Sequence, residues 1–267
     1  MTSTQELIHK YAWDYRFHPT DEELPQKEFN KVNQAIRERF TKDFEWKGQI
    51  PYMTFSNLLS IREHLLKTDE DSMLGIVAPP GVGKSTFALA TARLLDSKFN
   101  PKNVIFTNEH LNKFLGKATK ELNRIKKARE KGLSPKNKYS GSVIVLDEGV
   151  YMLFSGDANS KAGKMAIKLF SIIRALNLIF IVNITNWRKI SQGVKEDRFK
   201  VLIQLPQKGF IKFYSPKRIQ NIQIKKNSLK WPSPNFYEQV GLISDCSFWR
   251  EYESAKSQFL DEVTNEA

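Results

Sequence analysis

The chain has 267 residues, which is long enough for one large α/β domain with appendages or for two small domains. Hydrophobic residues make up 40% of the sequence and aromatic residues 12%, so a core can form and global disorder is excluded as an interpretation. Lys and Arg number 42 against 29 Asp and Glu, and the net charge of +13 favours a polyanionic partner, either nucleic acid or an anionic membrane surface. A uniformly Lys-rich composition would give the same charge without such a partner.

The single cysteine, Cys246, excludes a disulfide framework and a cysteine-based zinc site, and it is typical of a reducing cytoplasm. The first ten residues lack the apolar run of a signal peptide. The longest apolar stretch, residues 176–184, is interrupted by asparagines and is too short to span a bilayer. We therefore expect a protein without a transmembrane segment that resides in the cytoplasm, or in the host cytoplasm if the chain is viral.

The first sixty residues predict a helical lead-in. Residues 20–23 resemble a capped helix start, and the apolar residues that follow recur at spacings of three and four: Phe29, Val32, Ile36 and Phe40. A second helix is predicted over residues 55–66. We expect residues 1–60 to form a helical N-terminal extension that packs on the main domain.

From residue 73 onward, predicted strands alternate with predicted helices. The strands are 73–77, 103–107, 142–146 and 178–185, and the helices begin at Ser85 and span 111–131 and 162–175. This alternation implies βαβ units, hence an α/β fold with a mainly parallel central sheet flanked by helices on both faces. Two β-like segments, 199–205 and 209–214, would complete a core over 61–215. Residues 216–267 would hold a basic stretch and a C-terminal helix near 248–263.

Residues 78–86 carry the most specific motif. They read Ala78-Pro79-Pro80-Gly81-Val82-Gly83-Lys84-Ser85-Thr86. This is the P-loop pattern with Ala78 in place of the leading glycine, and a predicted strand precedes it and a predicted helix follows. We predict that these nine residues bind ATP.

Each position of the motif has a chemical reason. Gly81 and Gly83 permit the backbone angles and the close approach that let several N–H groups converge on a polyphosphate. The helix that begins near Lys84 adds its positive dipole end. Lys84 supplies a charge for the β- and γ-phosphates, and the Ser85 hydroxyl is a ligand for Mg²⁺.

An acidic pair follows the strand at 142–146. That strand delivers Asp147 to the sheet edge where ligands bind, and we expect it to adjoin the P-loop strand. Asp147 would hold Mg²⁺, and Glu148 is the candidate general base for the attacking water. Because an acidic pair favours water over the acceptor of a small-molecule kinase, the predicted reaction is hydrolysis. The alternative is a solvated acidic turn.

The strand at 178–185 lies between two further candidates. Arg174 precedes it at a helix end, and Thr185 and Asn186 follow its apolar run. If this strand neighbours 142–146, Thr185 or Asn186 would reach the γ-phosphate region. Arg174 could serve as an arginine finger for the next subunit's nucleotide. Alternatively, Arg174 pairs with a surface acid and Asn183 or Asn186 caps a turn.

These elements together resemble the FtsK–HerA superfamily of DNA-pumping ATPases, which includes viral packaging ATPases and zonula occludens toxin-like proteins. The resemblance covers roughly residues 74–206 and includes Arg174-Ala175 before the strand. Members often carry Gly where this chain has Asn177, and Gln where it has Asn186. The resemblance implies a RecA-like core, a homo-oligomer in the form of a hexameric ring, and ATP-driven movement of DNA through its centre.

Two basic clusters support a nucleic-acid partner. Residues 111–140 hold ten Lys and Arg, within 113–138, against two Glu, and residues 207–231 hold seven, within 208–230, and no acid. Each could neutralise several phosphates of DNA without reading sequence. Aromatic side chains in the second cluster could stack on single-stranded bases: Phe210, Phe213, Tyr214 and Trp231. A solvated basic surface is the alternative.

The sequence therefore favours an ATPase that translocates or packages DNA for a virus or mobile element. One alternative is an AAA+ regulator or helicase loader of the DnaC type, in which ATP is an assembly switch. That alternative expects a helical lid after the core, whereas the residues after Leu205 are β-like and then basic. Another is a membrane-associated phage extrusion ATPase, which would need a membrane partner.

Overall fold

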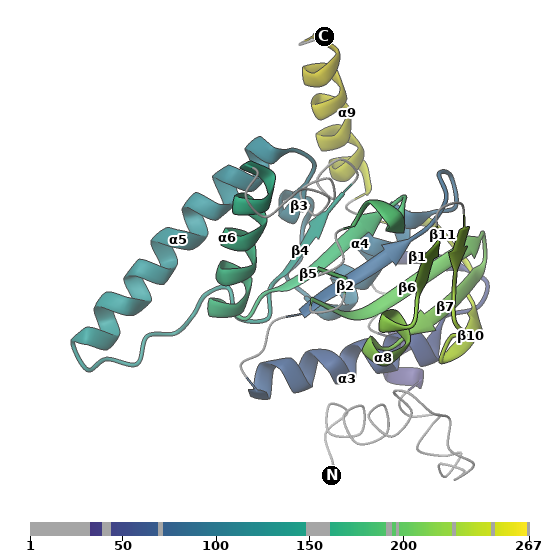
Figure 1. The fold of residues 1–267 in the computed structure, drawn as a ribbon, viewed down its shortest axis with the longest axis horizontal. Coiled ribbons are helices and arrows are strands. Elements are labelled where there is room, and N and C mark those ends of the chain that lie inside the picture. Colours follow the sequence, from purple (N-terminus) through teal and green to yellow (C-terminus); the bar gives the residue numbers. More distant parts are fainter. Residues whose placement is uncertain are drawn as a thin grey trace.

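The computed structural model describes residues 33–38, 44–68, 72–147, 161–190, 194–195, 198–225, 228–246 and 249–265, and Figure 1 shows how they are arranged. The helices are α3 (Tyr52–Thr68), α4 (Lys84–Leu95), α5 (Asn108–Glu130), α6 (Lys161–Ala175), α8 (Pro216–Gln220) and α9 (Trp249–Asn265), with the short 3₁₀ helices η1 (Pro101–Asn103) and η3 (Trp187–Lys189). The strands are β1 (Phe44–Lys47), β2 (Ser72–Val77), β3 (Val104–Ile105), β4 (Val143–Leu146), β5 (Ile179–Ile184), β6 (Phe199–Gln207), β7 (Phe210–Tyr214), β8 (Gln223–Lys225), β9 (Ser228–Lys230), β10 (Phe236–Gln239) and β11 (Leu242–Cys246).

Seven strands form the central sheet, in the order β10-β7-β6-β2-β5-β4-β3. The pairs from β6 to β3 are parallel, whereas β7 and β10 extend the sheet in antiparallel fashion. The predicted α/β class with a mainly parallel sheet is confirmed. The expectation that the strand before Asp147 adjoins the P-loop strand was wrong, because β5 lies between β2 and β4. After β2 the chain forms β3 at the edge of the sheet. It then forms β4 and β5, each one position closer to β2.

Helices cover both faces of the sheet (Figure 1). Leu74 and Ile76 of β2 belong to the core that includes α3 and α4, while Met73 and Val77 belong to the core that includes α5 and α6. Successive residues of β2 thus enter opposite layers, as the two-residue period of a strand requires. Burial on both faces explains why the strand is an uninterrupted apolar run apart from Gly75.

The segments outside the parallel sheet are tied to it. β1 pairs with β11, and β8 pairs with β9. The Glu238 carboxylate of β10 accepts hydrogen bonds from the backbone N–H groups of Met53 and Thr54, each at 2.8 Å, and so caps the start of α3. Residue 60 lies inside α3, and β10, which follows residue 215, pairs with β7 of the central sheet.

Only part of the predicted N-terminal helix is described. Residues 33–38 are helical, and Ile36 is fully buried. Residues 20–23, Phe29, Val32 and Phe40 lie outside the described residues. Within the described ranges, none of the helices combines the length and the apolar character needed to cross a bilayer.

Candidate functional site

The loop between β2 and α4 is an open cradle. Gly81 and Gly83 have φ values of 76° and 98°, a left-handed conformation that favours glycine. A Cβ added at either position would meet no atom within 4 Å, so the space in front of the loop is free for a ligand. Gly83 is the N-cap of α4 and makes no side-chain capping hydrogen bond. The first N–H groups of α4 therefore face the loop without a side-chain acceptor.

A pocket of about 630 Å³ lies over this cradle. Lys84 is buried, with 7% of its surface exposed, at the floor of the pocket. Two different parts of the chain line the pocket, the P-loop and α9: Pro79, Pro80, Gly81, Gly83, Lys84, Ser85 and Thr86 from the first, and Trp249, Tyr252, Glu253 and Lys256 from the second, with Thr185 beside them. The predicted phosphate site is thus an open cavity and is not blocked by its own prolines.

Asp147 reaches the P-loop from the end of β4. Its side chain is fully buried and accepts hydrogen bonds from three neutral groups. Asn183 Nδ2 donates at 2.7 Å, the Tyr252 hydroxyl at 2.5 Å, and Ser85 Oγ at 3.3 Å. The structure therefore brings Asp147 and Ser85 together, as the sequence predicted for a shared Mg²⁺ site.

Asn183 belongs to this site, although the sequence predicted it only as an alternative turn cap. It is the fifth residue of β5, the strand between β2 and β4, and is fully buried. Its Nδ2 is bonded to Asp147, while its Oδ1 is buried without a hydrogen-bond partner among the described residues. An orphaned buried acceptor costs roughly 1–3 kcal/mol. A water bound to Mg²⁺ would satisfy it, so the residues present fit the metal.

Tyr252 is the second site residue that the sequence analysis missed. It comes from α9, is 1% exposed, and lies against Phe106 and Trp249 with ring centroids 5.7 and 5.1 Å away. Burial, followed by the charge of Asp147, raises the pKa of the Tyr252 hydroxyl. The hydroxyl is therefore protonated and donates to Asp147. The only sequence signal was a pair of aromatic residues one helical turn apart in a segment expected to be a tail.

The remaining predicted site residues do not all lie at the phosphate pocket. Thr185 lines the phosphate pocket, but Asn186 is exposed and caps η3, accepting a hydrogen bond from Arg188 N at 3.0 Å. Asn186 thus has the capping role that the sequence analysis gave as its alternative. Arg174 is exposed at the end of α6, on the sheet edge where β4 and β5 begin, and so lies away from Lys84. Glu148 lies outside the described residues.

Asn177 shows how this chain accommodates its departure from the family pattern. It follows α6 with φ 48°, and it is the one non-glycine residue with positive φ within the described ranges. Asparagine tolerates this left-handed conformation better than most residues, so it can replace glycine there. The turn it forms is closed by hydrogen bonds from Asn177 N to Arg174 O at 3.2 Å and from Leu178 N to Ile173 O at 3.0 Å.

The two basic clusters lie on different parts of the fold. Most residues of 113–138 are on α5 and the loop after it, and the described basic residues of 208–230 are on the β6–β7 turn, β7, α8, β8 and β9. The prediction that Phe213 and Tyr214 stack on bases was wrong, since both are fully buried. Strand β7 is covered on both faces, so consecutive aromatic residues enter opposite core layers. Phe210 and Trp231 are half-buried.

Among solved structures, the chain is similar to EssC (ATPases 2 and 3) from Geobacillus thermodenitrificans, with 16% identity and a TM-score of 0.39 over 74% of this chain and 45% of that one. It is similar to the N-terminal domain of zonular occludens toxin from Neisseria meningitidis, with 16% identity and a TM-score of 0.36 over 60% of this chain and 95% of that one. It is also similar to the cytoplasmic domain of the type VII secretion ATPase EccC from Thermomonospora curvata, with 13% identity and a TM-score of 0.33 over 67% of this chain and 24% of that one.

The chain therefore spans less than half of the EssC and EccC structures. No curated protein sequence matches it. A family profile does match: "ATPase family associated with various cellular activities (AAA)" covers residues 74–207, half of the 267 residues. This range includes the P-loop and Asp147. The chain belongs to the AAA family of P-loop ATPases and is an ATP-hydrolysing enzyme that uses Mg²⁺.

Proposed function

We propose that this ATPase couples ATP binding and hydrolysis to the translocation or packaging of DNA for a virus or mobile element. The observation that carries the ATPase part is the buried Asp147 carboxylate within hydrogen-bond reach of Ser85 beside an open P-loop. The DNA part is supported by the basic clusters within 113–138 and 208–230. Such clusters bind the phosphate backbone in a salt-dependent and sequence-tolerant way.

The groups that would perform hydrolysis come from three strand ends. Backbone N–H groups of the P-loop and α4 would bind the phosphates, and Lys84 would stabilise negative charge that develops on them. Ser85 and Asp147 would hold Mg²⁺, which when bound neutralises phosphate oxygens. Asn183 orients the Asp147 carboxylate through its 2.7 Å hydrogen bond. Glu148, the next residue along the chain, would accept the proton of the attacking water.

Arg174 would act on a neighbouring subunit. Within its own subunit it lies at the amino edge of the parallel sheet, whereas the P-loop lies at the carboxyl edge. An arginine at that position can reach a triphosphate only if a second copy of the chain presents one. The proposal therefore includes a homo-oligomeric ring, with hexamer as the expected size, in which Arg174 serves as a trans-acting finger.

The ATPase rate tests the DNA part directly. The rate of phosphate release is measured with and without duplex and single-stranded DNA across a series of salt concentrations, and the particle mass is determined alongside. We expect DNA to raise the rate severalfold at low salt and the effect to fade as salt rises. Hydrolysis that is indifferent to both forms of DNA at every salt concentration would contradict DNA movement.

The AAA family match and the position of α9 favour a second candidate, a regulator in which ATP controls assembly. α9 contributes Trp249, Tyr252 and Lys256 to the pocket over the P-loop. A bound nucleotide would therefore contact this C-terminal helix directly. This candidate predicts a particle mass that grows on addition of ATP, with turnover unaffected by DNA. The proposed motor predicts the opposite response of turnover.

A further inference from the structure

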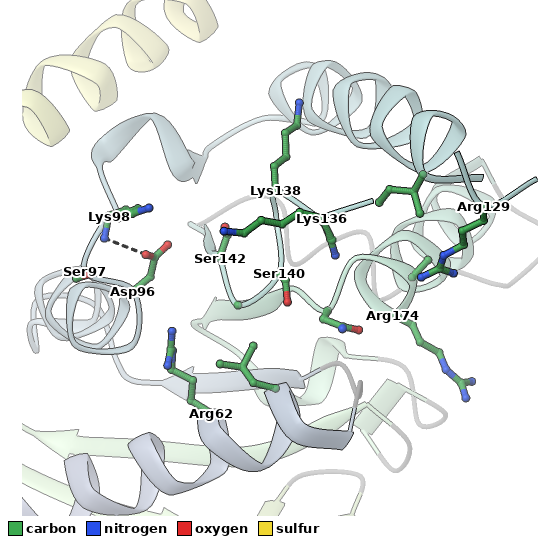
Figure 2. Close-up of a pocket in the computed structure, with 16 residues that line it drawn as sticks. Arg62, Asp96, Ser97, Lys98, Arg129, Lys136, Lys138, Ser140, Ser142 and Arg174 are labelled. Carbon is green, nitrogen blue, oxygen red and sulfur yellow. Dashed lines mark hydrogen bonds between the residues drawn. The ribbon is translucent and has the colours of Figure 1, made fainter. Parts of the chain in front are cut away.

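A second large cavity lies at the sheet edge opposite the phosphate pocket (Figure 2). Its volume is about 860 Å³. It is enclosed by the ends of α4, α5 and α6, by α3, and by the loop that returns from α5 to β4. It contains none of the residues assigned to the nucleotide apart from Arg174, whose side chain points outward, away from Ser140 (Figure 2).

The cavity is strongly basic. Six cationic residues line it, namely Arg62, Lys98, Arg129, Lys136, Lys138 and Arg174. Of these, Arg174 points outward (Figure 2), and Lys138 Nζ lies 3.7 Å from the Glu121 carboxylate, which is not part of the lining. Among the described residues that line it, Asp96 is the sole carboxylate. Figure 2 shows Arg62 and Arg129 directed inward from opposite sides, with Lys136 between them. Like charges gathered around one space repel one another, and an anionic ligand would relieve that repulsion.

Arg62 gives a second indication of a ligand. It comes from α3, and its Nε is buried without a hydrogen-bond partner among the described residues. Burial lowers the pKa of the Arg62 guanidinium, and the charge of Asp96 opposes this only in part. A buried donor of a charged group that lacks an acceptor is costly. A phosphate in the cavity would offset the desolvated charge of this guanidinium.

The surroundings favour a polymer over a compact ligand. Small-molecule pockets are lined mainly by apolar and aromatic side chains, whereas hydroxyl and amide groups accompany the cations here: Ser97, Ser140, Ser142, Asn137 and Asn177. Positive charge also continues beyond the rim, because Lys126, Lys127 and Lys131 are exposed at the end of α5. A charged path that leaves the cavity matches a chain of phosphates, of which one or two would enter.

We propose that this cavity binds the phosphodiester backbone of nucleic acid, without sequence preference. The inference rests on the proposed function and specifies where on each subunit the nucleic acid runs. It assigns the main path to the amino edge of the sheet, so the cluster within 113–138 should contribute more to binding than the cluster within 208–230.

The test compares two double variants with the wild-type chain. Arg129→Ala/Lys136→Ala removes two exposed cations of the cavity, and Lys208→Ala/Lys217→Ala removes two equally exposed cations of the other cluster. Binding to a fluorescent duplex of mixed sequence is measured by anisotropy between low and moderate salt. For the cavity variant we expect at least ~10-fold weaker binding at low salt, and a slope of log K against log salt shallower by about 1.8, since each duplex phosphate contact contributes about 0.9. The control should lose clearly less affinity than the cavity variant, and an equal loss in both would overturn the cavity assignment.

The possible results separate the two proposals. Unchanged affinity and slope in the cavity variant, or a loss confined to the Lys208/Lys217 variant, would overturn the cavity assignment while leaving DNA movement standing. Failure of the wild type to bind either duplex or single strand would overturn both. Unchanged basal ATPase without DNA verifies that the variants fold, and Lys136→Ala alone should lower the slope by about 0.9. Binding of inorganic tripolyphosphate by the wild type, without any binding of DNA, would overturn the assignment and identify a compact ligand instead.

Discussion

The hydroxyl of Tyr252 makes a hydrogen bond whose contribution to the free energy of unfolding can be measured. It donates to the Asp147 carboxylate at 2.5 Å, and both side chains are buried. Hydrogen bonds to charged groups contribute roughly 1.5–3 kcal/mol, about twice the value for neutral pairs. Tyr252→Phe removes this donor and changes little else in shape. We therefore expect the free energy of unfolding to fall by about 1.5–3 kcal/mol.

Tyr214 provides a matched control. It is also fully buried, but its hydroxyl donates to a neutral acceptor, Gln204 Oε1, at 3.1 Å. Tyr214→Phe should therefore cost only about 0.5–1.5 kcal/mol. For a chain of this size, at about 2 °C per kcal/mol, these costs correspond to a fall in Tm of roughly 3–6 °C for Tyr252→Phe and about 1–3 °C for Tyr214→Phe.

Urea unfolding followed by circular dichroism gives both free energies under the same conditions. The reasoning requires the Tyr252 variant to lose clearly more stability than the Tyr214 variant. If the two variants are equally stable, or Tyr252→Phe unfolds at the wild-type urea concentration, then Asp147 is not a buried carboxylate held by α9.

The remaining predictions concern turnover and pH. Glu148→Gln should leave ATP affinity intact and abolish phosphate release; normal turnover would remove Glu148 as the general base. Arg174→Ala should lose turnover and regain part of it when mixed with Glu148→Gln subunits, because each supplies what the other lacks; absence of rescue would contradict a trans finger. Arg124 holds the pKa of Glu121 at about 2, below its ordinary 4.5, so the stability this pair gives is present above pH 4.5 and is lost as pH falls toward 2. Glu121→Gln should therefore lower Tm at pH 7 but not near pH 2, as a thermal melt at each pH would test.

The parts of the site that sequence predicted are those set by local patterns. A buried strand, two glycines and a helix start follow one another without interruption, so residues 78–86 could be placed from their neighbours alone. Asp147 could also be predicted from the sequence, because a four-residue apolar strand ends immediately before it at the sheet edge. Residues 78–86 and Asp147 lie close together because the carboxyl ends of parallel strands meet at the same edge of the sheet.

The missed parts depend on contacts that local patterns do not encode. Tyr252 meets Asp147 across 105 residues, and no periodicity in α9 identifies that partner. β5 lies between β2 and β4 and so places Asn183 beside Asp147. The apolar pattern of the sequence predicts these strands, but it does not predict their order in the sheet. The burial of Phe213 and Tyr214 likewise depends on distant segments that cover the two faces of β7, because Phe213 stacks on Phe236 and Tyr214 lies against Trp231.

We infer that the P-loop amides and the Lys84 ammonium bind a triphosphate beside Asp147. The most direct measurement is the rate of phosphate release from Mg·ATP at low ATP concentration, for the wild type and for Lys84→Ala. The account predicts that the variant loses about 100-fold or more in kcat/KM, because a charge aimed at the transferred phosphoryl group is removed. Equal rates for the two proteins would contradict it.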